Sequence, residues 1–233
     1  MPGKTDPSSI GILMLDSRFP RIPGDIGNPA TWLFPVRFKI VHGAFPDKVV
    51  RDRAEGLLEA FVSAGKELID EGSIAITTSC GFLSLFQPEL SSALNVPVMT
   101  SSLMQVELVN RMLPAGKRTG VLTIAASSLS DDHLRLAHLP VDTPVGTTEG
   151  GSEFTRVILN NEPQLDIELA RQENVEAAVR LQNDHSDLGA IVLECTNMAP
   201  YARDIATTTG LPVFSIVTMV DWLHSGLLAR SFD

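Results

Sequence analysis

Two stretches of this chain, residues 73–80 and 188–195, share an apolar pattern, and each ends in a cysteine. When the second half of the sequence is moved back by 115 positions, five identities fall in one ungapped register: Ala75 with Ala190, Ile76 with Ile191, Cys80 with Cys195, Pro97 with Pro212 and Val98 with Val213. A repeat of this length in a single register indicates an internal duplication. The chain has only these two cysteines, so we expect them to be equivalent residues of two half-domains.

Strand-length apolar runs alternate with helical patterns through both halves. The runs at 9–16 and 118–125 open the two halves and are apolar almost throughout, which is typical of buried parallel strands. Residues 47–71 repeat apolar side chains at close to 3.6 positions, which predicts one long helix, and residues 164–183 predict a second. We therefore predict an α/β fold of two similar open parallel-sheet lobes, related by a pseudo-twofold duplication, with the active site in the cleft between them.

The duplication also sets the expected domain boundaries. The first lobe should comprise residues 9–100 together with part of the C-terminal region, and the second lobe residues 118–216. Residues 1–8 show no periodicity and are expected to form a loose tail. A chain of 233 residues with 44% hydrophobic content is long enough to bury two coupled cores of this size.

The segment 18–32 is unusual because it holds three prolines and two glycines, which exclude a helix or an inner strand. Irregular loops of this length inside a compact domain often cover a binding site. Two interpretations stay open. The segment is either a lid over the active site or a packed surface connection with Trp32 buried beneath it.

Composition excludes several classes of partner. The net charge is −10 with only 18 lysines and arginines, so a nucleic-acid backbone would be repelled. No apolar run approaches the roughly 18 residues that span a membrane, and the start lacks the pattern of a secretion signal, so a cytoplasmic location with reduced thiols is expected. Neither cysteine has a CxxC partner or a histidine at ligand spacing, which argues against a metal site, and we assign no histidine to catalysis.

Both cysteines follow a predicted strand and precede a predicted helix, which is where ligands collect in open α/β sheets. A thiol with a pKa near 8.5 is mostly protonated at neutral pH, and lowering that pKa by two units takes roughly 3 kcal/mol. A helix N-terminus supplies at best about 2 kcal/mol. Further stabilisation would come from neighbouring backbone N–H groups or from the side chains of Thr78, Ser79, Thr196 and Asn197.

Three other polar residues lie near the ends of the predicted strands. Strand alternation directs Glu194 to the side opposite Cys195, and a carboxylate would raise a thiol pKa, so we do not expect Glu194 at the reacting centre. Asp16 and Ser17 end the first strand and are expected to line the crevice, although Asp16 could equally cap a turn.

The residues around both cysteines, 78–81 and 194–197, and the opening run 10–17 resemble the aspartate/glutamate/hydantoin racemase superfamily over nearly the whole chain. In members such as glutamate racemase, one cysteine thiolate removes the proton next to a carboxylate or carbonyl, and a second cysteine returns a proton on the opposite face. These enzymes need neither pyridoxal phosphate nor a metal. The resemblance implies that Cys80 and Cys195 are the acid/base pair, that Thr196 helps to hold a small carboxylate substrate, and that the protein forms a homo-oligomer.

The flanking residues depart from the amino-acid racemases. This chain has Gly81 and Phe82 where those enzymes carry Asn-Thr, and Asn197 where they carry His or Glu. Hydantoin racemases, arylmalonate decarboxylases and maleate isomerases are similar in fold and vary at these positions. The residues expected to contact substrate are Asp16, Ser17, Thr78, Ser79, Gly81, Thr196 and Asn197.

The main expectation is a cofactor-independent racemase or epimerase of an amino acid or hydantoin-like compound, with two-base proton transfer between Cys80 and Cys195. One alternative is a decarboxylase or cis/trans isomerase of the same superfamily, in which one cysteine can act alone. The other is a two-lobed small-molecule binding protein without catalysis, in which both cysteines are merely small buried residues.

Overall fold

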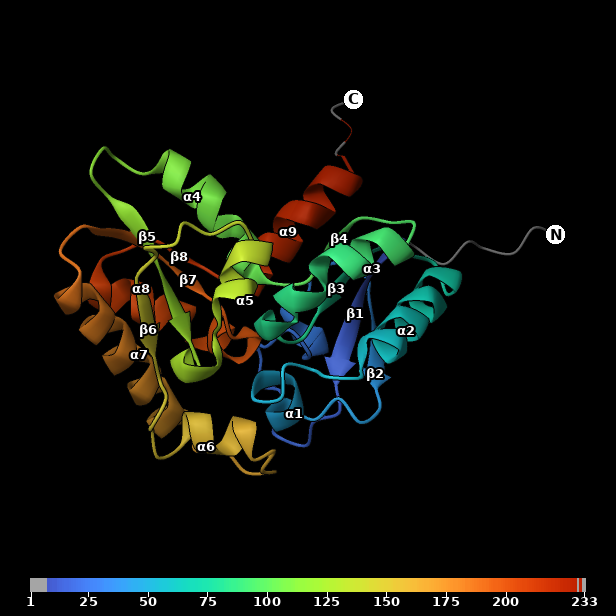
Figure 1. The fold of residues 1–233 in the computed structure, drawn as a ribbon, viewed down its shortest axis with the longest axis horizontal. Helices are drawn as coiled ribbons and strands as arrows, with labels where there is room; N and C mark the ends of the chain where they lie inside the picture. Colours follow the sequence, from blue (N-terminus) through green and yellow to red (C-terminus); the bar gives the residue numbers. More distant parts are fainter. Residues whose placement is uncertain (1–7, 230, 232–233) are drawn as a thin grey trace.

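A computed structural model describes residues 8–229 and 231, so all but the last residue of the expected N-terminal tail lies outside the described residues. Two four-stranded parallel sheets frame the molecule, one in each lobe (Figure 1). The first sheet has the order β2 (Val36–Val41), β1 (Ser9–Leu15), β3 (Ser73–Thr78), β4 (Val98–Met99). The second has the order β6 (Val145–Thr147), β5 (Arg118–Thr123), β7 (Leu188–Leu193), β8 (Val213–Phe214).

The pairing of the strands repeats in the two lobes with the offset seen in the sequence. Ile76 of β3 pairs with Val98 of β4, and Ile191 of β7 pairs with Val213 of β8. Both central pairs also carry an irregularity in the first residues of β1 and of β5. The predicted duplicated α/β fold is therefore confirmed.

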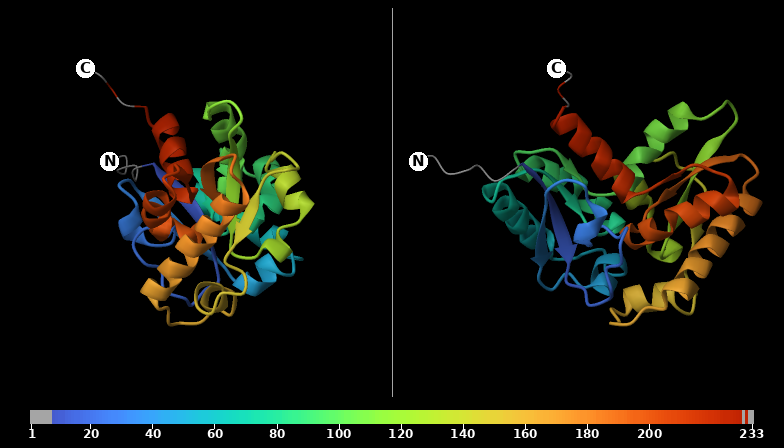
Figure 2. Two further views of the ribbon diagram at one scale, coloured as in Figure 1. Left: turned by 90° about the vertical axis from the view of Figure 1, so that its left-hand side faces the viewer. Right: turned by 180° about the vertical axis from the view of Figure 1, so that it is seen from behind.

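Nine helices flank the two sheets in the described part of the chain. The two lobes stand side by side in Figure 1 and in the right panel of Figure 2. The helices are α1 (Pro46–Val50), α2 (Leu58–Asp70), α3 (Gln87–Ala93), α4 (Val106–Met112), α5 (Asp131–Leu136), α6 (Phe154–Leu159), α7 (Ile167–Asp184), α8 (Ala202–Thr209) and α9 (Ile216–Leu227). Two short 3-10 helices, η2 (Gly81–Phe86) and η5 (Thr196–Tyr201), follow the cysteines.

The long helix expected at residues 47–71 is instead two helices, α1 and α2. Turns connect them, and within these turns Arg53, Ala54 and Gly56 have φ angles of 55°, 54° and 74°. Such angles belong to the left-handed region and cannot continue a right-handed helix, even though the apolar spacing runs on.

The last helical segment of each half packs against the sheet of the other half. In the first lobe, Ile216 and Val220 of α9 lie in one apolar cluster with Ile10 and Ala75. In the second lobe, Leu103 and Val106 pack in a cluster with Val121 and Val192: Leu103 lies in the 3-10 helix η3 (Ser102–Gln105) and Val106 begins α4. Within the C-terminal region, α9 therefore packs against the sheet of the first lobe.

The segment 18–32 is folded against the body of the protein. Its only regular element is the 3-10 helix η1 (Pro29–Thr31). Trp32 is 7% exposed, and its indole Nε1–H donates to the carbonyl of Ile26. The packed interpretation of Trp32 is therefore correct, and Phe19 and Asp25 of the same segment are also buried.

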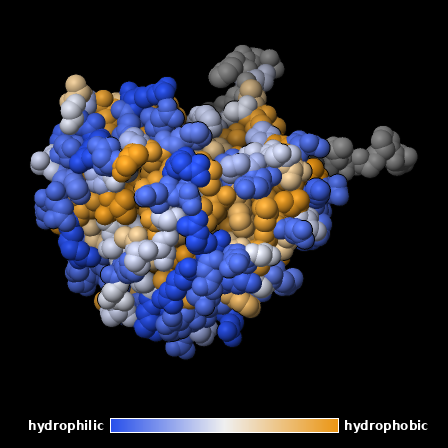
Figure 3. Space-filling view, viewed as in Figure 1, coloured by the Kyte–Doolittle hydropathy of each residue, from blue (hydrophilic) through white to orange (hydrophobic). Residues whose placement is uncertain are grey.

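The face shown in Figure 3 is largely hydrophilic, with apolar side chains in separate patches. None of the helices in residues 8–229 is long and apolar enough to cross a membrane.

Candidate functional site at the two cysteines

Cys80 and Cys195 line the same cavity between the lobes. Each follows the last strand residues of its lobe's β3 or β7 and is the N-cap residue of η2 or η5. Both are free thiols, and they are 8% and 7% exposed. The duplication thus brings one thiol from each lobe to a shared site, as the sequence predicted.

The cavity is small and mostly apolar. Its volume is about 20 Å³, which is room for about one water molecule, so the site is closed in this structure. The polar lining residues are Ser79, Cys80, Glu194, Cys195, Thr196 and Asn197. The apolar lining residues are Leu15, Phe19, Pro46, Val50, Phe82, Ile124, Ile158 and Leu159.

A cover over the cavity is built from α1 of the first lobe and α6 of the second, which contact each other (Figure 1). Beside α6, Asn161 connects the lobes. Its Oδ1 accepts the backbone N–H of Arg18 at 2.5 Å, and its Nδ2 donates to the carbonyl of Asp16 at 3.3 Å. Access to the thiols therefore requires these elements to separate.

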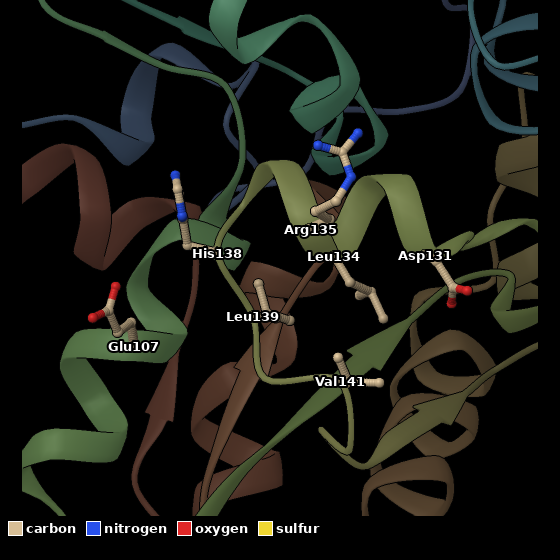
Figure 4. Close-up of a pocket in the computed structure, with 7 residues that line it drawn as sticks. All are labelled: Glu107, Asp131, Leu134, Arg135, His138, Leu139 and Val141. Atoms are coloured by element: carbon tan, nitrogen blue, oxygen red, sulfur yellow. The ribbon is translucent and has the colours of Figure 1, made fainter.

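A larger open hollow of about 530 Å³ lies on the outside of the second lobe, between α4 and α5 (Figure 4). Its lining includes Glu107, Arg135 and His138 but neither cysteine. Volume alone therefore does not identify the reactive site, and the chemistry points to the smaller cavity.

Backbone N–H groups reach both sulfurs. The N–H of Phe82 donates to Cys80, and the N–H of Asn197 donates to Cys195, and each bond lowers the thiol pKa. Burial has the larger effect and raises the pKa of both thiols well above the usual value, and the nearby Glu194 raises both further. Both cysteines are therefore neutral thiols while the cavity is closed.

A chain of hydrogen bonds distinguishes Cys195 from Cys80. The Cys195 thiol donates to Oδ1 of Asn197 at 3.6 Å, and Nδ2 of Asn197 donates to Asp25 at 2.6 Å. Asp25 also accepts from the Arg21 guanidinium at 3.1 Å and from the N–H of Gly27 at 2.7 Å. Because Asp25 holds the amide nitrogen, the amide oxygen faces the sulfur and favours the protonated thiol.

Glu194 lines the cavity, so the expectation that it lies on the opposite side is wrong. The strand β7 ends at Leu193, and alternation no longer sets the direction of the next side chain. The Glu194 carboxyl is fully buried, and Oε2 accepts from the Thr123 hydroxyl at 2.7 Å. Oε1 has no hydrogen-bond partner among the described residues. Burial raises the pKa of Glu194 to about 8, and the bond from Thr123 only partly opposes this.

Of the predicted substrate contacts, Ser79, Thr196 and Asn197 line the cavity. Thr196 also joins the lobes, because its hydroxyl donates to the carbonyl of Ser79 at 2.7 Å, and the Ser79 hydroxyl accepts from the N–H of Leu15 at 2.9 Å. The bond from Thr196 connects the two cysteine turns, and the bond from Leu15 fixes the turn of the first lobe to β1.

The remaining predicted contacts are not among the lining residues. Asp16 accepts the N–H of Gly43, the Ser17 hydroxyl accepts from Arg21, and the Thr78 hydroxyl donates to the carbonyl of Thr100. Gly81 is buried beside Glu194. Contact between any of these residues and substrate stays a prediction.

Sequence reasoning missed Phe19, Asp25 and Glu194 as parts of the site. Phe19 and Asp25 belong to the irregular segment 18–32, whose composition was the available signal. Among the described residues, no group of three or more His, Cys, Asp or Glu side chains could hold a metal ion.

No family model matches the chain, but individual relatives do. It is 28% identical over 240 residues to a dimethylsulfoniopropionate lyase of Durusdinium sp. clade D, covering 97% of this chain and 78% of that protein. It is 26% identical to dimethylsulfoniopropionate lyase 6 of Emiliania huxleyi, covering 96% of this chain and 61% of the relative. The chain thus spans less than two thirds of the second lyase.

Solved structures share the fold at low sequence identity. Allantoin racemase from Klebsiella pneumoniae matches with a TM-score of 0.66 and 16% identity over 96% of this chain and 90% of that chain. Arylmalonate decarboxylase matches with a TM-score of 0.61 and 16% identity over 97% and 94%.

These comparisons correct the expected activity. The curated relatives are lyases, which overturns the main expectation of a racemase or epimerase and favours the alternative in which the same fold carries out a different reaction. The named relatives are enzymes. The chain shares the α/β fold of arylmalonate decarboxylase, allantoin racemase and glutamate racemase.

Proposed function

We propose that this protein is a lyase that breaks the carbon–sulfur bond of dimethylsulfoniopropionate and releases dimethylsulfide and acrylate. The observation that carries the proposal is the likeness to lyases of this compound over 97% of the chain. The two-thiol cavity described above supplies the chemistry that such a reaction needs.

The reaction begins with the same step as a racemisation. A thiolate removes a proton from the carbon next to the substrate carboxylate, and the electrons of the broken C–H bond form the carbon–carbon double bond. The carbon–sulfur bond breaks, and its own electron pair stays on the sulfonium sulfur, so dimethylsulfide leaves as a neutral molecule. The proton stays on the cysteine, and the other product is acrylate. A site built for proton removal beside a carboxylate therefore suits elimination when the substrate carries a good leaving group.

Only one thiolate is needed for this elimination, and Cys80 is the better candidate. Both sulfurs receive a backbone N–H, but the Cys195 thiol also donates to Asn197, and the negative charge of Asp25 raises its pKa. The positive charge of Arg21 instead lowers the pKa of Cys80. Cys195 keeps its proton and supports the substrate. Burial still disfavours a thiolate, so ionisation of Cys80 accompanies binding of the positively charged substrate.

The first N–H groups of η2 and η5, those of Gly81 and Thr196, have no partner within their own helices and are the natural donors for the substrate carboxylate. The next N–H groups, those of Phe82 and Asn197, already bond to the cysteine sulfurs. The apolar wall excludes water from the reacting carbon. The closed volume of about 20 Å³ is too small for the substrate, so α1 and α6 must separate before it enters.

Proton NMR of the purified protein with dimethylsulfoniopropionate in heavy water tests the proposal. Acrylate and dimethylsulfide should accumulate in equal amounts. Exchange of deuterium into unreacted substrate without cleavage, or no change in the substrate, would contradict it.

A further inference from the structure

Glu194 is a buried acid that the elimination step does not use. Among the described residues that line the cavity, it is the only carboxyl, and none of them is a lysine, arginine or histidine. One of its oxygens accepts from Thr123, and the other has no partner there. A buried carboxyl with a free oxygen is costly unless it is protonated or meets a cation.

The duplication shows that this acid belongs to one lobe only. Ser79 precedes Cys80 as Glu194 precedes Cys195, and their backbone N–H groups bond to the equivalent carbonyls of Leu13 and Leu122. The short Ser79 hydroxyl is satisfied by the N–H of Leu15. The cavity is therefore symmetric in its thiols but asymmetric in its acid.

The space for the Glu194 side chain comes from Gly81. A Cβ atom at Gly81 would lie 2.2 Å from Oε1 of Glu194 and 2.3 Å from its carbonyl oxygen, far inside van der Waals contact. The equivalent residue in the second lobe is Thr196. Glu194 can therefore occupy this space only because residue 81 is a glycine without a side chain.

The rest of the wall suits a cation that carries methyl groups. The rings of Phe19 and Phe82 and the aliphatic side chains of Ile124 and Ile158 line the same cavity. Aromatic faces attract methylated cations, and aliphatic side chains pack against methyl groups.

We propose that Glu194 is the counter-ion of the substrate's onium group and so determines specificity for a methylated cation over a neutral group of the same shape. For the sulfonium of dimethylsulfoniopropionate, this inference rests on the proposed function. Glu194 attracts the sulfonium leaving group to its own side of the cavity. The substrate therefore binds in one orientation, although the two thiols are equivalent in the duplication.

A matched pair of unreactive ligands tests the inference by calorimetry. 3-(Trimethylammonio)propionate and 4,4-dimethylpentanoate have the same shape, but only the first is a cation. Wild-type protein should bind the cation at least about tenfold more tightly, as expected of a partly desolvated charge pair. Glu194→Gln should bind both ligands with similar affinity. Glu194→Asp, which keeps the charge, should retain the preference.

Glu89→Gln is the matched control, because Glu89 is exposed on α3 and does not line the cavity. This variant should keep the full preference for the cation. The inference is overturned if wild-type protein shows no preference, if it binds neither ligand, or if Glu194→Gln keeps the preference.

Lyase assays separate this result from the proposed function. If the wild type prefers the cation but releases no dimethylsulfide, the proposed function fails and the role of Glu194 stands. If Glu194→Gln cleaves dimethylsulfoniopropionate with an unchanged KM, the role of Glu194 fails and the lyase stands.

Discussion

Cys80 and Cys195 are equivalent in the duplication, but their surroundings differ. Asn197 faces Cys195, whereas its counterpart near Cys80 is Phe82, which cannot accept a hydrogen bond from a thiol. The buried Asp25 fixes the direction of the Asn197 amide. The two thiols therefore differ in their hydrogen-bond partners, and this difference is one reason why we propose Cys80 as the base.

At the residue scale, burial predicts slow alkylation of both cysteines. The thiol pKa values lie well above the usual range, and each unit of this shift lowers the thiolate fraction tenfold. Iodoacetamide at pH 7.5 should react with Cys80 and Cys195 at least about 100-fold more slowly than with a free cysteine peptide, as measured by mass spectrometry. Rapid labelling of both residues would show that the cavity is open in solution.

The raised pKa of Glu194 predicts how the stability of the protein depends on pH. Its pKa is raised from 4.5 to about 8, so the folded protein keeps a proton that the unfolded chain loses between these values. The free energy of unfolding should therefore fall as pH rises from 5 to 8, with a contribution of at most about 1.4 kcal/mol per pH unit. The ionisable groups that face Glu194, Cys80 and Cys195, remain neutral in the folded protein over this range.

Urea unfolding of wild type and Glu194→Gln at several pH values measures this contribution. The glutamine variant should lose less stability across the window, because it has no proton to release. Parallel curves for the two proteins would mean that Glu194 is already ionised in the folded state.

At the scale of elements, the sequence predicted the strands better than the helices and loops. Apolar runs fixed β1, β3, β5 and β7, because a buried parallel strand needs apolar side chains on both faces. The spacing at 47–71 could not reveal the left-handed turns that divide α1 from α2, because the periodicity of apolar residues contains no information about φ angles. Glu194 was misplaced because alternation was extended one residue past the end of β7.

The structure of the irregular segment 18–32 could also be predicted only in part from the sequence. Its prolines and glycines excluded regular structure, but the positions of Phe19 and Asp25 depend on contacts with the other lobe. Asp25 meets Asn197 from 172 positions away in the sequence, and no local pattern encodes that bond.

The cover formed by α1 and α6 carries a prediction about opening. Asn161 has a φ of 58°, which glycine adopts readily, and its side chain supplies two bonds between the lobes. Asn161→Gly should keep the backbone and remove both bonds, worth about 1 kcal/mol each, so labelling of Cys80 should accelerate about tenfold or more. Asn160→Ala is the control, because the Asn160 side chain bonds to Glu162 of its own segment. Equal labelling rates in the two variants would show that Asn161 does not hold the cover closed.

At the scale of the whole molecule, the duplication gives two lobes that cannot be separated cleanly. The exchanged segments α4 and α9 tie each half to the sheet of the other, and one continuous apolar cluster contains both cysteines together with Leu13 and Leu122. Both thiols belong to this cluster, and residues of α1 and α6 line the cavity that contains them.

The most direct test of the account is the rate of dimethylsulfide release from dimethylsulfoniopropionate by wild type, Cys80→Ala and Cys195→Ala, followed by gas chromatography. Loss of the base should lower kcat by about 10²- to 10⁴-fold in Cys80→Ala. Loss of a supporting hydrogen-bonding group should lower it by only about tenfold in Cys195→Ala. Undiminished release by Cys80→Ala, or no release by the wild type, would contradict the assignment of this cavity as the site of carbon–sulfur cleavage.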